Sequence, residues 1–141
     1  IALNLATLIR SHIRGTRCRV YMAEVKTRIQ RKQSYYYPDV MVGCDPKDRQ
    51  SESYLDRPCL LIEVLSESTK HIDKREKLLA YQSLGSVQEY VIVSQTEPLV
   101  EGHRRSEQGQ WSVDTYNTMG EKIGFRCIDL QVTMQDIYED V

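Results

Sequence analysis

One short apolar segment decides the fold of this chain: Cys59-Leu60-Leu61-Ile62-Glu63-Val64-Leu65. A nearly continuous apolar run of this length predicts a strand that is covered on both faces. A single acid, Glu63, interrupts the run. Because burying a carboxylate without a partner is very unfavourable, a cation, a basic side chain or backbone donors must compensate it. Glu63 is therefore either half of a buried salt bridge or part of a functional site. Buried ion pairs stabilise a fold only weakly, so a site is at least as good an explanation.

Helices and strands are predicted on both sides of this segment. After it, Ser66, Ser68 and Thr69 offer caps for a helix over 72–84 that Gly85 ends. Further strands are predicted over 87–94 and 125–130, an antiparallel pair over 99–105 and 111–116, and a short final helix over 134–138. Before it, the pattern predicts a helix over 2–14, strands over 18–23, 24–30 and 35–42, and a polar loop over 45–58. This order predicts an α/β fold with a mixed sheet flanked by helices.

Length and composition indicate one ordinary soluble domain spanning residues 1–141. Hydrophobic residues make up 40% of the chain and charged residues 28%, and no apolar run is long enough to cross a bilayer. No signal peptide is visible. Because the chain opens with Ile1 inside a predicted helix, we expect that an N-terminal segment is missing. The four cysteines, Cys18, Cys44, Cys59 and Cys127, are scattered, which predicts buried free thiols and a cytoplasmic location rather than a zinc site.

The charge distribution is uneven although the net charge is only −1. Eight Lys or Arg residues and one acid lie between Arg10 and Gln33, whereas the stretch from Asp129 to Val141 has no basic residue. The basic part could lie against phosphates, but from charge alone a solvated surface is the better interpretation.

Two further residues suggest chemistry together with Glu63. Asp39 lies within the predicted strand over 35–42, where aspartate is disfavoured, although an isolated aspartate there is more often exposed or in a turn. Lys77 shares a helix face with Ala80, Tyr81 and Leu84, so it should point toward the sheet. The simpler interpretation of Lys77 is an ion pair with Asp73, one turn earlier, with its stem reaching outward.

Two carboxylates on neighbouring strands and an ammonium group from a packed helix suit one kind of reaction. Two carboxylates can hold Mg²⁺, a hard cation that keeps several waters. Such an ion polarises a phosphoryl oxygen and lowers the pKa of its bound water. A lysine beside it can orient the attacking water or offset phosphate charge. Asp39, Glu63 and Lys77 together predict phosphodiester hydrolysis.

The same residues carry a family resemblance over nearly the whole chain. They are Tyr36-Tyr37-Pro38-Asp39-Val40, then Leu61-Ile62-Glu63-Val64-Leu65-Ser66-Glu67-Ser68-Thr69, then Asp73, Lys77, Tyr81 and Glu89-Tyr90. This pattern resembles the Uma-two-type family of proposed bacterial restriction endonucleases, in the PD-(D/E)xK nuclease superfamily. The resemblance implies a restriction-endonuclease-like core and Mg²⁺-dependent cleavage of nucleic acid, with DNA as the expected substrate and Mn²⁺ as an alternative ion.

The resemblance also implies roles for particular residues. Asp39 and Glu63 become metal ligands, with the backbone carbonyl of Val64 as a third. In the standard motif a lysine stands two residues after the acid. Here that position, two residues after Glu63, holds Leu65, which cannot serve. The resemblance therefore assigns the role of the lysine to Lys77 in the following helix. Where the family often has Trp and Asp in the strand after the Glu-Tyr pair, this chain has Val91 and Ser94.

Two other functions compete with a nuclease. A catalytically inactive domain that binds nucleic acid or protein would use the basic stretch and Tyr35, Tyr36 and Tyr37, since aromatic rings stack on bases. Those tyrosines are equally good strand formers. A glycosidase with two carboxylates would leave Lys77 without a role. Simultaneous cleavage of both DNA strands needs two sites, which argues for a homodimer from function alone.

Overall fold

A computed structural model describes residues 1–31, 33–50, 53–66 and 74–141. The first part of the chain contains α1 (Ala2–Ile13), β1 (Arg19–Met22), β2 (Lys26–Ile29), β3 (Ser34–Tyr36) and β4 (Val40–Gly43). The middle contains the 3-10 helix η1 (Pro46–Gln50), β5 (Tyr54–Leu55), β6 (Pro58–Leu65), α2 (Lys74–Gln82) and β7 (Glu89–Ser94). The last part contains β8 (Val100–Arg105), β9 (Trp111–Tyr116), β10 (Lys122–Phe125), η2 (Arg126–Ile128), β11 (Leu130–Thr133) and α3 (Met134–Ile137).

A six-stranded mixed sheet forms the centre, in the order β1-β4-β6-β7-β8-β9. Only β6 and β7 pair in parallel, and all the other neighbours in this sheet are antiparallel. Because β6 has a strand on each side and layers on both faces, its side chains are almost all buried. The predicted α/β fold with a mixed sheet flanked by helices is therefore confirmed.

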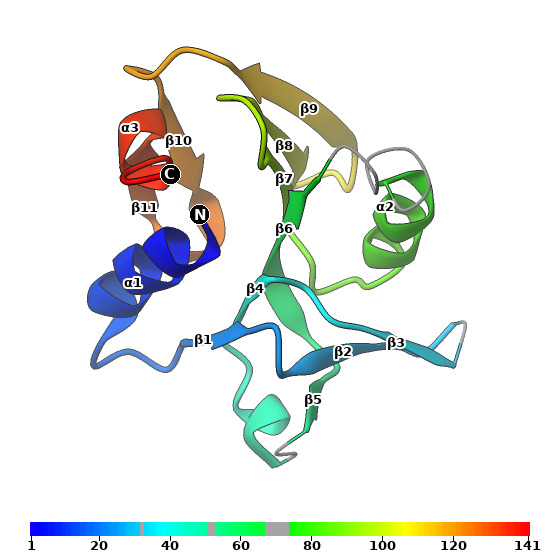
Figure 1. Ribbon diagram of the computed structural model, residues 1–141. Helices are drawn as coiled ribbons and strands as arrows, with labels where there is room; N and C mark the ends of the chain where they lie inside the picture. Colours follow the sequence, from blue (N-terminus) through cyan, green and yellow to red (C-terminus); the bar gives the residue numbers. More distant parts are fainter. Residues whose placement is uncertain (32, 51–52, 67–73) are drawn as a thin grey trace.

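Two hydrophobic cores lie on the two faces of this sheet. On one face, α1, the β10–β11 hairpin and α3 cover Leu60 and Ile62. On the other face, α2 and residues of β2 and β5 cover Leu61 and Leu65. Figure 1 shows α1 and α3 on one side of the sheet and α2 on the other. Strand alternation puts Glu63 on the α2 face, together with Leu61 and Leu65.

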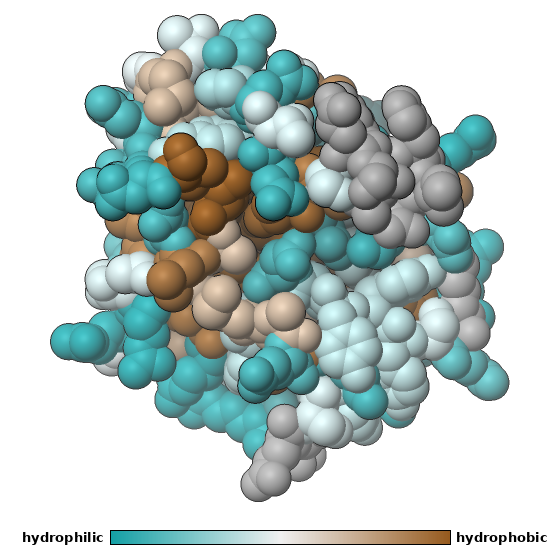
Figure 2. Space-filling model, viewed as in Figure 1, coloured by the Kyte–Doolittle hydropathy of each residue, from teal (hydrophilic) through white to brown (hydrophobic). Residues whose placement is uncertain are grey.

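Exposed hydrophobic residues are unevenly distributed over the surface. The face in Figure 2 is mostly hydrophilic, and its hydrophobic residues gather on the side of α1 and the two chain ends. Leu3 in α1 and Val141 at the C-terminus are each 67% exposed. Among the described residues, no helix is both long enough and apolar enough to cross a membrane.

Two predicted strands are each divided in the structure. The prediction over 35–42 is wrong as a single strand, because β3 ends at Tyr36 and β4 begins at Val40. Pro38 lies in the gap, where it has no N–H to donate to a ladder. The prediction over 125–130 is also wrong: η2 and Asp129, whose φ is 52°, turn the chain between β10 and β11. Aspartate tolerates this left-handed conformation, so no glycine or proline marks the turn.

The cysteine prediction is wrong for two of the four residues, because a disulfide joins Cys18 to Cys44. The β1–β4 ladder pairs Arg19 with Gly43, so the next residues outward, Cys18 and Cys44, lie opposite each other. Cys59 and Cys127 are free thiols, and Cys59 is buried. Sequence spacing could not show this pairing because it depends on the register of two strands.

Candidate active site

Glu63 is the buried acid at the centre of the candidate site. Its side chain is on β6 and the residue is only 3% exposed. One carboxylate oxygen accepts a hydrogen bond from the Tyr81 hydroxyl at 2.9 Å. The other lies 3.3 Å from the Lys77 ammonium. The buried carboxylate therefore has both a hydrogen-bond donor and a positive charge, as its place in an apolar strand requires.

Asp39 reaches the same place from the neighbouring strand. It lies directly before β4, which pairs with β6 from Val40↔Ile62 onward. The Asp39 Oδ2 atom accepts the backbone N–H of Val64 at 2.7 Å. The β4–β6 ladder ends at Val40 and Ile62, so β4 offers no backbone partner to the amide of Val64. The Asp39 carboxylate accepts that hydrogen bond instead. This contact holds Asp39 beside the residue that follows Glu63.

Helix α2 brings the third predicted residue to the site. Ala80, Tyr81 and Leu84 are buried against the sheet, as the predicted helix face requires, while Leu79 is 58% exposed. The Lys77 side chain lies on this face and is 18% exposed. The structure therefore brings Asp39, Glu63 and Lys77 together, with Lys77 directed toward Glu63 rather than into solvent. The alternative partner Asp73 lies outside the described residues.

Burial and charge act on Glu63 in opposite directions. Burial raises the pKa of Glu63 above its ordinary value, and the negative charge of Asp39 raises it as well. Lys77 and the Tyr81 hydroxyl lower that pKa but do not offset the burial. Burial and the adjacent carboxylate also raise the pKa of Tyr81, so its hydroxyl remains a donor. Burial therefore outweighs the neighbouring lysine in setting the pKa of Glu63.

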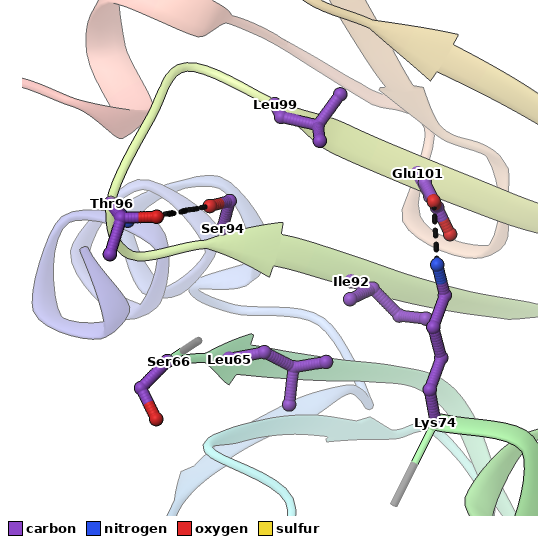
Figure 3. Close-up of a pocket in the computed structure, with 8 residues that line it drawn as sticks. All are labelled: Leu65, Ser66, Lys74, Ile92, Ser94, Thr96, Leu99 and Glu101. Atoms are coloured by element: carbon purple, nitrogen blue, oxygen red, sulfur yellow. Dashed lines mark hydrogen bonds and ion pairs between the residues drawn. The ribbon is translucent and has the colours of Figure 1, made fainter. Parts of the chain in front are cut away.

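A second ion pair lies on the same sheet face, next to a small pocket. Ile92 pairs with Glu63 and also with Glu101, so Glu101 lies two strands away from Glu63. Lys74, one helical turn before Lys77, contacts Glu101 at 2.7 Å. Figure 3 shows this pair beside the pocket at the ends of β6 and β7. Burial works against ionisation of Glu101, but Lys74 and His103 together lower its pKa.

The available ligands suit a hard cation bound by few protein groups. Among the described residues, no group of three or more His, Cys, Asp or Glu side chains is placed to hold a metal. Asp39 lies near enough to Glu63 for its negative charge to raise the pKa of Glu63, and a cation close to both carboxylates would relieve that repulsion. Two carboxylates plus a backbone carbonyl match Mg²⁺, which keeps most of its waters.

Sequence reasoning did not give Tyr81 a definite role in the site. The structure makes its hydroxyl the shortest contact to Glu63. The sequence does hold a signal for this role of Tyr81. Lys77 is predicted to face the buried Glu63, and Tyr81 follows Lys77 by four residues on the same helix face.

Comparisons with known proteins found a matching family model and curated relatives. The Uma2 family model, described as "Putative restriction endonuclease", matches residues 1–135. An uncharacterized protein of Synechocystis sp. is 33% identical over 138 residues, which are 98% of this chain and 72% of that protein. A second uncharacterized protein of Synechocystis sp. is 31% identical over 113 residues, covering 79% of this chain and 64% of that protein.

Solved structures share this fold, among them a protein of Anabaena variabilis. It is described as a putative nuclease belonging to DUF820 from Anabaena variabilis, and it matches with a TM-score of 0.79. The match covers 97% of this chain and 77% of that chain at 15% sequence identity. At that identity the likeness shows the fold alone.

Proposed function

The chain belongs to the Uma2 family, described as "Putative restriction endonuclease", and from this premise we propose that it is a Mg²⁺-dependent endonuclease that hydrolyses phosphodiester bonds of DNA. In this proposal residues 1–141 form a single nuclease domain. The observation that carries it is the meeting of Asp39, Glu63 and Lys77 on one sheet face, although they come from three separate segments. A purely structural salt bridge would need only Glu63 and Lys77.

The metal ligands would be Asp39, Glu63 and the backbone carbonyl of Val64. Because Val64 donates its N–H toward Asp39, its carbonyl points to the same side of β6. A bound Mg²⁺, or Mn²⁺ in its place, would polarise the phosphoryl oxygen and generate hydroxide from its water. Lys77 would offset negative charge on the phosphate, since its ammonium lies 3.3 Å from the Glu63 carboxylate and its side chain is not fully buried. Tyr81 would hold Glu63 in place.

A surface next to the site could receive the nucleic acid. The small sheet β3-β2-β5 carries Tyr35, which is 44% exposed, and Tyr37 beyond β3 is 54% exposed. Lys26 lies 4.5 Å from the centre of the Tyr35 ring. Cations and exposed aromatic rings together bind phosphates and stack on bases. Tyr37 precedes Asp39 by two residues, so this surface leads directly to the proposed metal site.

Plasmid cleavage in Mg²⁺ or Mn²⁺ tests the proposal. We expect the wild-type chain to cut, and Glu63→Ala and Lys77→Ala to lose most of the activity. Lys74→Ala is the matched control, because it removes the same side chain from the adjacent helical turn but breaks a pair with Glu101 instead. It should retain most of the cleavage. Equal background nicking in wild type and all variants would exclude the nuclease function.

The second candidate function is nucleic-acid binding without cleavage. The exposed Tyr35 and Tyr37, with Lys26 over the Tyr35 ring, favour this function. They could bind nucleic acid even if Asp39 and Glu63 did not hold a metal ion. Gel-shift binding by a chain that does not cut in either metal would support this function.

We propose that the nuclease acts as a homodimer with two sites. Linear plasmid that appears together with nicked plasmid would support this arrangement.

A further inference from the structure

All four cysteines of the chain meet at one place. The disulfide joins Cys18 to Cys44, and the Cys44 sulfur lies 3.9 Å from that of Cys59. The Cys59 thiol donates to the Cys127 sulfur at 2.8 Å, although 68 positions separate these residues in the sequence. Four scattered cysteines lie in one cluster only if strand register and packing bring them there.

The cluster lies at the far end of the strands that carry the candidate active site. Asp39 precedes β4 and Cys44 follows it, while Cys59 and Glu63 lie near opposite ends of β6. The pairing of β4 with β6 shifts between Val42 and Gly43, and Cys59 lies opposite that step. The cluster is therefore separate from the proposed metal site and does not depend on the proposed function.

A surface pocket gives access to the cluster. Its lining includes Cys44, Cys59, Arg17, Arg57, Ser86 and Gln88. Arg57 also contacts Asp45 of the same pocket at 3.7 Å, and the Arg57 side chain is 46% exposed. Arg17 and Arg57 line this pocket together with the single acid Asp45, so the charged residues of its lining are net positive, which favours an anionic reagent.

We propose that Cys59 and Cys127 form a redox site that reacts with an anionic low-molecular-weight disulfide and closes to a second disulfide bond. The 2.8 Å separation of the two sulfur atoms and the opening of the pocket at Cys59 carry this inference. Glutathione disulfide, which bears carboxylates, represents the chemical class of the oxidant.

The reaction consists of two exchange steps. The Cys59 thiolate attacks one sulfur of the small disulfide, a Cys59–sulfur bond forms, and one small thiolate leaves and takes up a proton. The Cys127 thiolate then attacks Cys59, the Cys59–Cys127 bond forms, and the second small thiolate leaves. Two protein thiols are oxidised and one small disulfide is reduced to two thiols. The protons lost by the cysteines balance those taken up by the leaving thiolates.

The pocket explains the order of the two steps. Cys59 is among the residues that line it, so the reagent meets Cys59 first. Burial and the neighbouring Cys59 raise the pKa of the Cys127 thiol, which therefore stays protonated before the first step. The Cys127 sulfur lies 2.8 Å from that of Cys59, so it is placed to displace the small thiol and is the resolving thiol.

Mass spectrometry of the whole chain, purified with Cys18–Cys44 intact, tests the proposal. With glutathione disulfide, the wild type should lose two hydrogen atoms and show a Cys59–Cys127 link in a non-reducing peptide map. Cys127→Ala should accumulate one glutathionyl group on Cys59, and Cys59→Ala should do neither. Because the closed loop is long, the oxidised chain should melt roughly 5–15 °C higher. Thermal unfolding of both variants establishes that they are folded.

A neutral probe tests the role of the pocket. Wild type should react faster with glutathione disulfide than with hydroxyethyl disulfide, and Arg57→Gln should slow only the charged reagent. The proposal is overturned if both thiols stay unreacted in the folded chain but react once it is unfolded. A Cys44–Cys59 link in place of Cys59–Cys127 would overturn it too.

Discussion

Removal of the Tyr81 hydroxyl by Tyr81→Phe should destabilise the protein through Glu63. The hydroxyl donates to a carboxylate that is 3% exposed, and Tyr81 itself is fully buried. Water cannot replace the lost donor without opening the core. A hydrogen bond to a charged group contributes about 1.5–3 kcal/mol. For a chain of 141 residues this loss corresponds to a fall in melting temperature of roughly 5–10 °C.

The loss should also depend on pH in a definite direction. The pKa of Glu63 is already raised in the folded protein, so folded Glu63 binds a proton more readily than unfolded Glu63. Stability from this group is complete below its unfolded pKa and is lost as pH rises through its folded pKa. The Tyr81 hydroxyl lowers the pKa of folded Glu63, so Tyr81→Phe should raise that pKa further. The loss of stability with rising pH then continues to a higher pH in the variant. The variant should therefore differ more from wild type at neutral pH than near pH 4.5.

Urea unfolding followed by circular dichroism, in EDTA to exclude metal, measures both effects. Tyr36→Phe is the matched control, because it removes the same atom from a tyrosine that packs against Tyr81 but reaches Glu76 in an exposed bond. The control should lose less than about 1 kcal/mol. If Tyr81→Phe were no more destabilising than Tyr36→Phe, the reasoning about the buried carboxylate would be refuted.

Three further changes test the packing and charges around the sheet. Gly43→Ala would place a Cβ 2.6 Å from Leu55, a buried side chain, and should lower the free energy of unfolding in urea by about 1–3 kcal/mol. Unchanged stability would mean that Leu55 moves freely. Arg104→Met leaves the buried Glu89 without its 3.4 Å ion pair and should cost about 3–5 kcal/mol by the same measurement, with partial recovery in the double variant with Glu89→Gln. No recovery would contradict the pairing. Burial lowers the pKa of His103 from its ordinary 6.5, so stability from this group is present above that pH and lost below it. His103→Gln should flatten the decline in unfolding free energy between about pH 7 and 5, and an unchanged slope would refute this cause.

Local patterns in the sequence predicted the parts of the fold that depend on short-range periodicity. The apolar run around Glu63 is a buried central strand, and Ala80 and Tyr81 form the buried face of α2, with Leu84 buried just beyond its end. The predicted pair over 99–105 and 111–116 is the antiparallel pair β8 and β9. These features follow from the side-chain direction of each element, which recurs every 2 or about 3.6 residues.

Long-range contacts decided the rest. Nothing local indicates that Cys18 faces Cys44, that Asp39 binds the amide of Val64, or that the Tyr81 hydroxyl supports Glu63. Each contact depends on strand register or on how a helix packs over a sheet. The sequence by itself therefore determined which residues carry charge into the core. Only the tertiary structure decided which partners they meet there, because a buried charge must find its partner across segments that are far apart along the chain.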